Sequence, residues 1–160
     1  MQSRKWIRVR PIKVSDFAFI RRVASKQTYF TVPPLFVLWL LKRTNSRNCI
    51  VAEHSTFGPV AYLLSILVSE RRQKVLYIWQ LAASTRGVCT GAIDETLLAL
   101  RVFVRRTGVK RLFLTVDPAS PEYRAIRRYA YSLSAKGIRP KQYLPRAVSR
   151  SEREYVISVR

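Results

Sequence analysis

The sequence predicts a mixed α/β (α+β) domain, with a mostly antiparallel sheet, one central parallel pair of strands, and helices on both faces. Hydrophobic residues make up 48% of the 160 residues and charged residues 24%, which is enough apolar surface for one ordinary core. Some segments alternate apolar and polar residues, and others repeat apolar residues at helical spacing. From Val75 to Val116, strand, helix and strand patterns follow one another, as in a parallel crossover. We expect residues 1–160 to form a single domain.

The N-terminal segment predicts one strand and two helices. Trp6 to Arg10 alternates apolar and basic residues, which favours a strand. Ser15 is suited to cap a helix whose apolar positions recur at helical spacing, at Phe17, Ile20, Val23 and Ala24. The pair Pro33-Pro34 begins a second apolar helix that runs through Leu41, and a polar turn follows at Thr44 to Arg47.

The middle of the chain predicts three strands. Asn48 to His54 and Val60 to Val68 are strand-like and are joined by a tight turn at Phe57-Gly58-Pro59, so we expect a hairpin. Glu70 to Lys74 is a charged turn, and Val75 to Ala83 is a further strand. The sheet therefore begins antiparallel.

The last part of the chain changes to helical spacing and then returns to strands. Thr90 to Thr107 is amphipathic and ends at Gly108, and Val109 to Val116 is a short apolar strand behind it. A final helix and two closing strands are predicted at Tyr123 to Ala135, Ile138 to Leu144 and Glu154 to Val159.

The net charge is unusually high. Thirty Lys and Arg against nine Asp and Glu give a formal charge of +21, which suits a polyanionic partner. The basic residues are spread along the chain, so the charge fits either nucleic-acid contact through a basic surface or a solvated arginine-rich surface.

Two features bear on location. The two cysteines, Cys49 and Cys89, have no further partners for a zinc set or a disulfide framework, so we expect a reducing compartment and a cytoplasmic protein. The longest apolar run, Val32 to Leu41, is about half of the roughly 20 residues that span a bilayer. We expect no membrane segment and no metal site.

The segment from Trp79 to Gly91 is the first candidate site. It places an Arg-Gly turn between a buried strand and a long helix, where free backbone N–H groups and the helix dipole can hold a phosphate. Gly87 and Gly91 would allow the backbone to approach that anion. Many strand-to-helix connections contain glycine, so a simple turn is the alternative.

The order of elements resembles the GNAT superfamily of N-acetyltransferases over nearly the whole chain, and within it the diaminobutyrate acetyltransferases. The similar stretches are Cys49 to Glu53, Ile78 to Ala82, Leu114 to Pro118, Arg124 to Ile126 and Glu152 to Tyr155. The resemblance implies an acetyl-CoA-dependent N-acetyltransferase that acts on a primary amine, such as a small diamino acid relative. It also implies that two central strands part after Gln80.

The resemblance further implies roles for individual residues. The acetyl-CoA ligands would be Leu81, Ala82, Ala83, Arg86, Gly87, Val88, Cys89, Thr90, Gly91, Ser120 and Arg127. Catalysis would involve Gln80, Tyr129 and Glu152, and the acceptor would meet Trp79, Tyr29, Thr115 and Glu154. The expected partners are a small-molecule amine, nucleic acid at the basic surface, and a second copy in a homodimer.

The sequence also departs from the family pattern. Cys89 stands at the second glycine of the Arg-Gly loop, and Arg127 stands where a thiolate-protonating tyrosine is common. The stretch from Thr28 to Pro34 offers little to bind an ammonium group. Two alternatives therefore remain: acetylation of an RNA-linked or ribosomal acceptor, and a GNAT-like RNA-binding or assembly protein that has lost catalysis.

Overall fold

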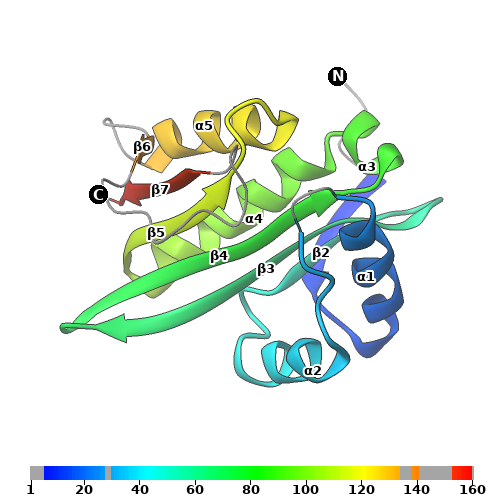
Figure 1. The fold of residues 1–160 in the computed structure, drawn as a ribbon, viewed down its shortest axis with the longest axis horizontal. Coiled ribbons are helices and arrows are strands. Elements are labelled where there is room, and N and C mark those ends of the chain that lie inside the picture. Colours follow the sequence, from blue (N-terminus) through cyan, green and yellow to red (C-terminus); the bar gives the residue numbers. More distant parts are fainter. Residues whose placement is uncertain (1–5, 28–29, 134–137, 141–152, 160) are drawn as a thin grey trace.

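The computed structural model describes residues 6–27, 30–133, 138–140 and 153–159 (Figure 1). Its strands form one sheet in the order β1-β2-β3-β4-β5-β7-β6. All neighbouring strands are antiparallel except β4 and β5, which are parallel. Their bounds are Ile7–Pro11 (β1), Ile50–His54 (β2), Gly58–Glu70 (β3), Gln73–Ala83 (β4), Val109–Val116 (β5), Ile138–Pro140 (β6) and Arg153–Ser158 (β7). The predicted mixed sheet with its parallel central pair is confirmed.

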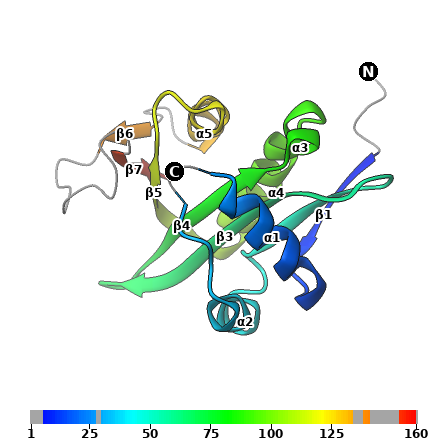
Figure 2. The same cartoon turned by 45° about the vertical axis from the view of Figure 1, so that its right-hand side comes forward.

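Helices cover both faces of the sheet, as predicted (Figures 1 and 2). They span Phe17–Ser25 (α1), Leu35–Thr44 (α2), Thr85–Cys89 (α3), Ala92–Thr107 (α4) and Pro121–Leu133 (α5), with a 3-10 turn at Val14–Asp16 (η2). The apolar sides of α4 and α5 share one core with the sheet, and those of α1 and α2 share another. Each face of the sheet therefore has its own core.

Several predicted boundaries change. Asp16, rather than Ser15, precedes α1, and its carboxylate accepts a hydrogen bond from the Lys13 N–H at 2.7 Å. The predicted helix from Thr90 begins only at Ala92, because Gly91 has a φ of +72° and separates it from the additional turn α3. Predicted strand residues 141–144 lie outside the described residues.

A buried cluster of charges joins β1, η2 and β2. The guanidinium of Arg10 donates to both oxygens of Asp16, at 2.7 and 2.9 Å, and its Nε donates to Glu53 at 2.9 Å. Asp16 is 1% exposed and Arg10 9% exposed. The buried charges are thus paired and hydrogen-bonded, as their loss of hydration requires.

Acidification is expected to weaken this cluster. The hydrogen bond from Arg10, more than its charge, lowers the pKa of Glu53. Because the folded pKa is the lower one, the stabilisation is complete above the unfolded pKa of about 4.3 and disappears as the pH falls through the folded value. Thermal unfolding from about pH 6 to about pH 3 should show a smaller fall in Tm for Glu53→Gln than for wild type. Equal falls in Tm for the variant and the wild type would show that other carboxylates cause the acid sensitivity.

Three further observations concern the described part of the chain. None of its helices is long and apolar enough to cross a membrane. It contains no group of three or more metal-ligating His, Cys, Asp or Glu side chains. Both cysteines are free thiols, with Cys49 buried and Cys89 exposed.

Candidate active site

The two central parallel strands separate at their carboxyl ends. The β4–β5 ladder runs from Lys74 opposite Val109 to Ile78 opposite Leu114 and then stops. Beyond that point β4 stays paired with β3 as far as Ala83, and β5 stays paired with β7 as far as Val116. A register shift leaves Trp79 as the extra residue of a β-bulge, which bends β4 at the place where the strands part.

A cleft occupies this opening. Its volume is about 550 Å³, including the open mouth. Its walls come from β4, β5, the beginning of α5 and the chain between α1 and α2: Gln27, Phe30, Ile78, Trp79, Leu81, Leu114, Thr115, Val116, Asp117, Ser120, Glu122 and Ile126. Only two of these side chains are charged, and both are carboxylates. In a chain with a net charge of +21, a cleft that has no cation among its described lining residues favours a cationic ligand.

Gln80 lies in the bulged region, but both ends of its amide are engaged. The side chain is 3% exposed, and its Oε1 accepts a hydrogen bond from the Tyr62 hydroxyl at 3.0 Å. Its Nε2 donates to the backbone oxygen of Thr31 at 2.8 Å. Burial raises the pKa of Tyr62, so its hydroxyl keeps its proton. Gln80 thus ties the chain before α2 to β4, beside the wall residue Phe30, and this placement indicates positioning rather than the predicted catalytic role.

The Arg-Gly turn is a short helix rather than an open loop. The N–H groups of Gly87 and Val88 donate to Ser84, at 3.2 Å to its Oγ and 3.0 Å to its backbone oxygen. The N–H groups of Thr90 and Gly91 donate to Arg86 and Val88 at 3.1 and 3.4 Å. The predicted phosphate cradle of free amides is therefore not formed by these four groups.

Gly87 has a packing role that its place in the turn did not reveal. A Cβ at this position would lie 2.1 Å from the backbone oxygen of Val60 and 2.9 Å from the Cβ of Ala83. The absence of a side chain lets α3 press against β3. Close contact inside the protein, rather than approach to an anion, explains this glycine.

Gly87→Ala is expected to destabilise the fold. The clash is with backbone, which cannot rotate away, so the cost should be about 2–3 kcal/mol, as for other overpacked sites. Chemical denaturation would measure it, with Cys89→Ala on the exposed side of the same turn as the control, expected within about 0.5 kcal/mol of wild type. A Gly87→Ala variant as stable as that control would contradict the close contact.

The structure brings some predicted residues to the cleft and leaves others elsewhere. Trp79, Leu81, Thr115 and Ser120 line it. Glu154 lies on β7 in register with Thr115. The remaining predicted residues do not line the cleft (Ala82, Ala83, Arg86, Gly87, Val88, Cys89, Thr90, Gly91, Arg127 and Tyr129), and Tyr29 and Glu152 lie outside the described residues.

Tyr129, one of the predicted catalytic residues, does not suit the role of proton donor to the leaving thiolate. Its side chain is 6% exposed and packs in the core that α4 and α5 share. Its hydroxyl has no hydrogen-bond partner among the residues that the structure describes, and burial raises its pKa above the usual range for tyrosine. Tyr129 therefore faces the core, whereas Arg127, at the position where the family commonly has a tyrosine, is exposed.

Sequence reasoning missed the two carboxylates of the cleft. Asp117 follows β5 directly, and its Oδ1 accepts a hydrogen bond from the Ala119 N–H at 2.9 Å. Glu122 lies in the first turn of α5, after Ser120, whose Oγ accepts from the Tyr123 N–H at 3.1 Å. Both carboxylates follow the carboxyl end of β5, a central parallel strand, and ligands commonly bind at such ends. Their place just after a predicted strand could therefore have identified them from the sequence.

Comparison with known proteins supports the fold. No protein-family model matches the sequence, and no curated protein matches it. Among solved structures, a chain of the NatC complex bound to Gag peptide and CoA has a TM-score of 0.76 and 12% identity, over 97% of this chain and 99% of its own. Ard1 from Thermoplasma volcanium has a TM-score of 0.71 and 15% identity, over 96% and 97% of the two chains.

Diaminobutyrate acetyltransferase EctA from Paenibacillus lautus, solved with L-2,4-diaminobutyric acid and coenzyme A, has a TM-score of 0.70 and 16% identity. The match covers 96% of this chain and 95% of that one. Identities this low establish shared architecture only. The bulged β4, the parting of β4 and β5, and these superpositions together show that the chain has the fold of the GNAT N-acetyltransferases.

Proposed function

We propose that this protein is an N-acetyltransferase that transfers the acetyl group of acetyl-CoA to a primary amine. The observation that carries the proposal is the opening between β4 and β5, with a cleft whose charged walls, among the described residues, are Asp117 and Glu122. Such an opening can hold a thin acyl chain on one side and receive a cation on the other.

The acyl donor would lie along the unpaired edge of β4. Pantetheine contains two amides, which can pair with Leu81 to Ala83 as an added strand would. Because the amides of Gly87, Val88, Thr90 and Gly91 are engaged, the diphosphate would depend on the first N–H groups of α4. The Glu95 N–H donates to the backbone oxygen of Gly91 at 3.3 Å and begins the hydrogen bonding of α4. Helix geometry therefore leaves the amides of Ala92, Ile93 and Asp94 for a ligand.

The acceptor would enter as an ammonium group and must lose a proton before it attacks. The amine nitrogen then bonds to the thioester carbon, the C–S bond breaks, and CoA leaves as a thiolate, which has a pKa near 8.5 and needs little help. The nitrogen releases its extra proton as the amide forms, and this proton passes to the thiolate or to water. We assign Glu122 as the base that takes the proton. Asp117 is less available, because one of its oxygens already accepts the Ala119 N–H.

The charge of the cleft also restricts the acceptor. No cation stands among its described lining residues to pair with the carboxylate of an amino acid. This favours an amine without a neighbouring carboxylate, such as a diamine or an amino group at the end of a longer chain. Diaminobutyrate, the substrate in the Paenibacillus structure, suits the cleft less well.

Binding of acetyl-CoA tests the proposal directly. Calorimetry should detect one site per chain, and quenching of tryptophan fluorescence should accompany it because Trp79 lines the cleft. A Trp79→Phe variant should bind but lose most of the quenching, since Trp6 and Trp39 lie elsewhere. No binding at high micromolar acetyl-CoA would remove the proposed function and favour a GNAT-like protein without catalysis.

Glu122→Gln is expected to lower kcat/KM for a diamine acceptor about 100-fold at neutral pH, the usual contribution of a positioned base. Affinity for acetyl-CoA should stay within about twofold, because the substitution removes a charge on the acceptor side only. The loss should become smaller as the pH approaches the pKa of the acceptor amine, when free amine is abundant. A loss that is the same at every pH would indicate a structural role instead.

A further inference from the structure

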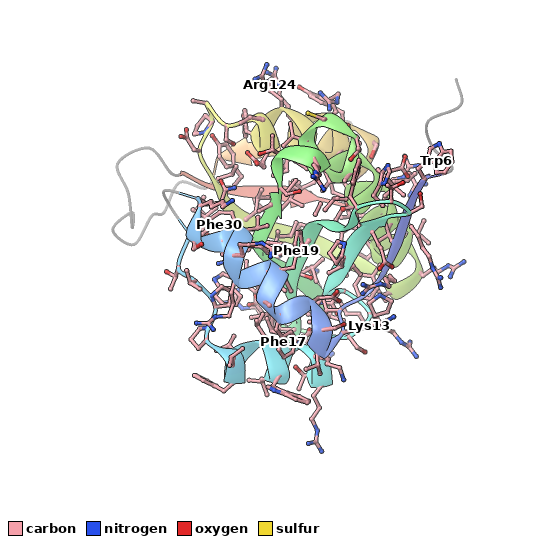
Figure 3. The ribbon with its side chains drawn as sticks, turned by 90° about the vertical axis from the view of Figure 1, so that its right-hand side faces the viewer. Trp6, Lys13, Phe17, Phe19, Phe30 and Arg124 are labelled. Carbon is pink, nitrogen blue, oxygen red and sulfur yellow. The ribbon has the colours of Figure 1, made fainter. Side chains whose placement is uncertain are left out.

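We infer that a basic trough between α1 and α3 binds single-stranded nucleic acid. The trough is separate from most of the cleft and has a volume of about 1120 Å³, including its open mouth. Its walls come from α1, the β2–β3 turn, the end of β4 and the beginning of α3. Figure 3 looks onto α1, which forms one wall, with Phe19 labelled on it.

The charge of the trough is opposite to that of the cleft. Arg22 and Lys26 lie four residues apart at the end of α1 and line one side, and Arg86 lines the other. None of the lining residues is a carboxylate. The hydroxyl of Thr85 also lines the trough and can donate a hydrogen bond to a phosphate oxygen, whereas that of Ser84 already donates to the backbone oxygen of Val60. Three cations around one concave surface provide the electrostatic part of nucleic-acid binding.

A stack of flat side chains gives the trough a place for a base. The rings of His54 and Phe57 are stacked, with centroids 4.6 Å apart and planes at 24°. The guanidinium carbon of Arg86 lies 4.6 Å from the centroid of the Phe57 ring. Arg86 is exposed and lines the trough, so its planar guanidinium is available there to a base. Bases unstacked from a single strand pack on such planes, whereas paired bases are not available to them.

The arrangement suits a strand better than a single phosphate. Phosphate contacts from both walls and a stacking surface between them match the repeating phosphate and base of an extended chain. The net charge of +21 adds long-range attraction to any polyanion. The trough also shares Gln27 with the cleft, so a strand bound there would pass close to the proposed acetylation site. Strand binding itself does not depend on the proposed function.

Fluorescence anisotropy with a labelled single-stranded RNA of about 12 nucleotides tests the site. The variant Arg22→Gln/Lys26→Gln/Arg86→Gln should bind at least about 10-fold more weakly at about 0.1 M salt. The slope of log K against log salt should fall by about 2, because three contacts on a single strand contribute about 0.7 each.

A second triple variant of equal charge is the control. Arg43, Arg106 and Lys110 are exposed and lie outside the trough, so changing all three to glutamine also removes three positive charges. This variant should keep most of the affinity and most of the salt slope. Equal weakening of the two triple variants would show that net charge alone drives binding, and would overturn the proposal. So would an absence of RNA binding by the wild type.

Two further measurements separate the nucleic-acid strand from other phosphate ligands. Arg86→Lys keeps the positive charge but loses the planar guanidinium, so affinity for RNA should fall several-fold while the salt slope stays unchanged. Unchanged affinity would show that no base stacks on Arg86 and would overturn the proposal. CoA in large excess should not displace the RNA. Displacement would assign the trough to the nucleotide of the acyl donor, while calorimetry with acetyl-CoA would still report on the proposed acetyl transfer independently.

Discussion

A Thr115→Trp variant is expected to fold normally and to lose acetyl-CoA binding. Thr115 is exposed on β5, one residue beyond the last β4–β5 pair, and its side chain lines the cleft. An indole there would fill the gap between the strands, and tryptophan is well tolerated on a strand. Calorimetry should show affinity reduced more than about 100-fold, which corresponds to about 2.7 kcal/mol.

Thr115→Val is the matched control, because it removes the hydroxyl and leaves the size unchanged. It should bind acetyl-CoA within about threefold of wild type if the gap itself is what the donor uses. Circular dichroism and Tm should show that both variants are folded. A Thr115→Trp protein that still binds acetyl-CoA tightly would place the donor outside the opening between β4 and β5.

Asp16→Ala is expected to cost about 3–5 kcal/mol of unfolding free energy, because it leaves a buried guanidinium without its main partner. Asp16 accepts both hydrogen bonds from Arg10 as well as the Lys13 N–H, and it is 1% exposed. For a domain of this size, Tm should fall by about 10 °C or more. Chemical denaturation with an unchanged m-value would confirm that the loss lies in the folded state.

The exposed pair of Asp94 and Arg128 provides the comparison. The Nη2 of Arg128 lies 3.0 Å from the Oδ1 of Asp94, so the two charges are in contact, but the side chains of Asp94 and Arg128 are 59% and 66% exposed. Asp94→Ala should cost less than about 1 kcal/mol, since water screens and replaces the interaction. Similar losses for Asp16→Ala and Asp94→Ala would contradict the distinction that burial makes between the two pairs.

The two proposed sites are lined by side chains of opposite charge. The cleft has two carboxylates and suits a cation, and the trough has three cations and suits an anion. Opposite charges on adjacent surfaces would hold an acceptor that combines an amine with a phosphate chain. An amine carried at the end of an RNA is one such molecule, and it would use both sites.

Much of the fold could be predicted from the sequence, because its signals are local. The short apolar stretch after Gly108 predicted the bounds of β5, Val109 and Val116, and the tight turn predicted the β2–β3 hairpin. The strand-helix-strand order predicted the parallel β4–β5 pair, because a helical crossover returns the chain to the end of the sheet where the first strand began. The bulge at Trp79 had no comparable signal, since no glycine or proline marks it.

The roles of single residues were decided by the tertiary structure. Gln80 meets partners 18 and 49 positions away in the chain, Tyr62 and Thr31, and Gly87 is fixed by the backbone of Val60. Periodicity shows which face of an element is apolar, but it does not show which distant groups stand opposite. The sequence by itself determined the elements, their order and the excess of positive charge. Only the folded chain decided that carboxylates line the cleft and cations the trough, because side chains far apart in sequence form each surface.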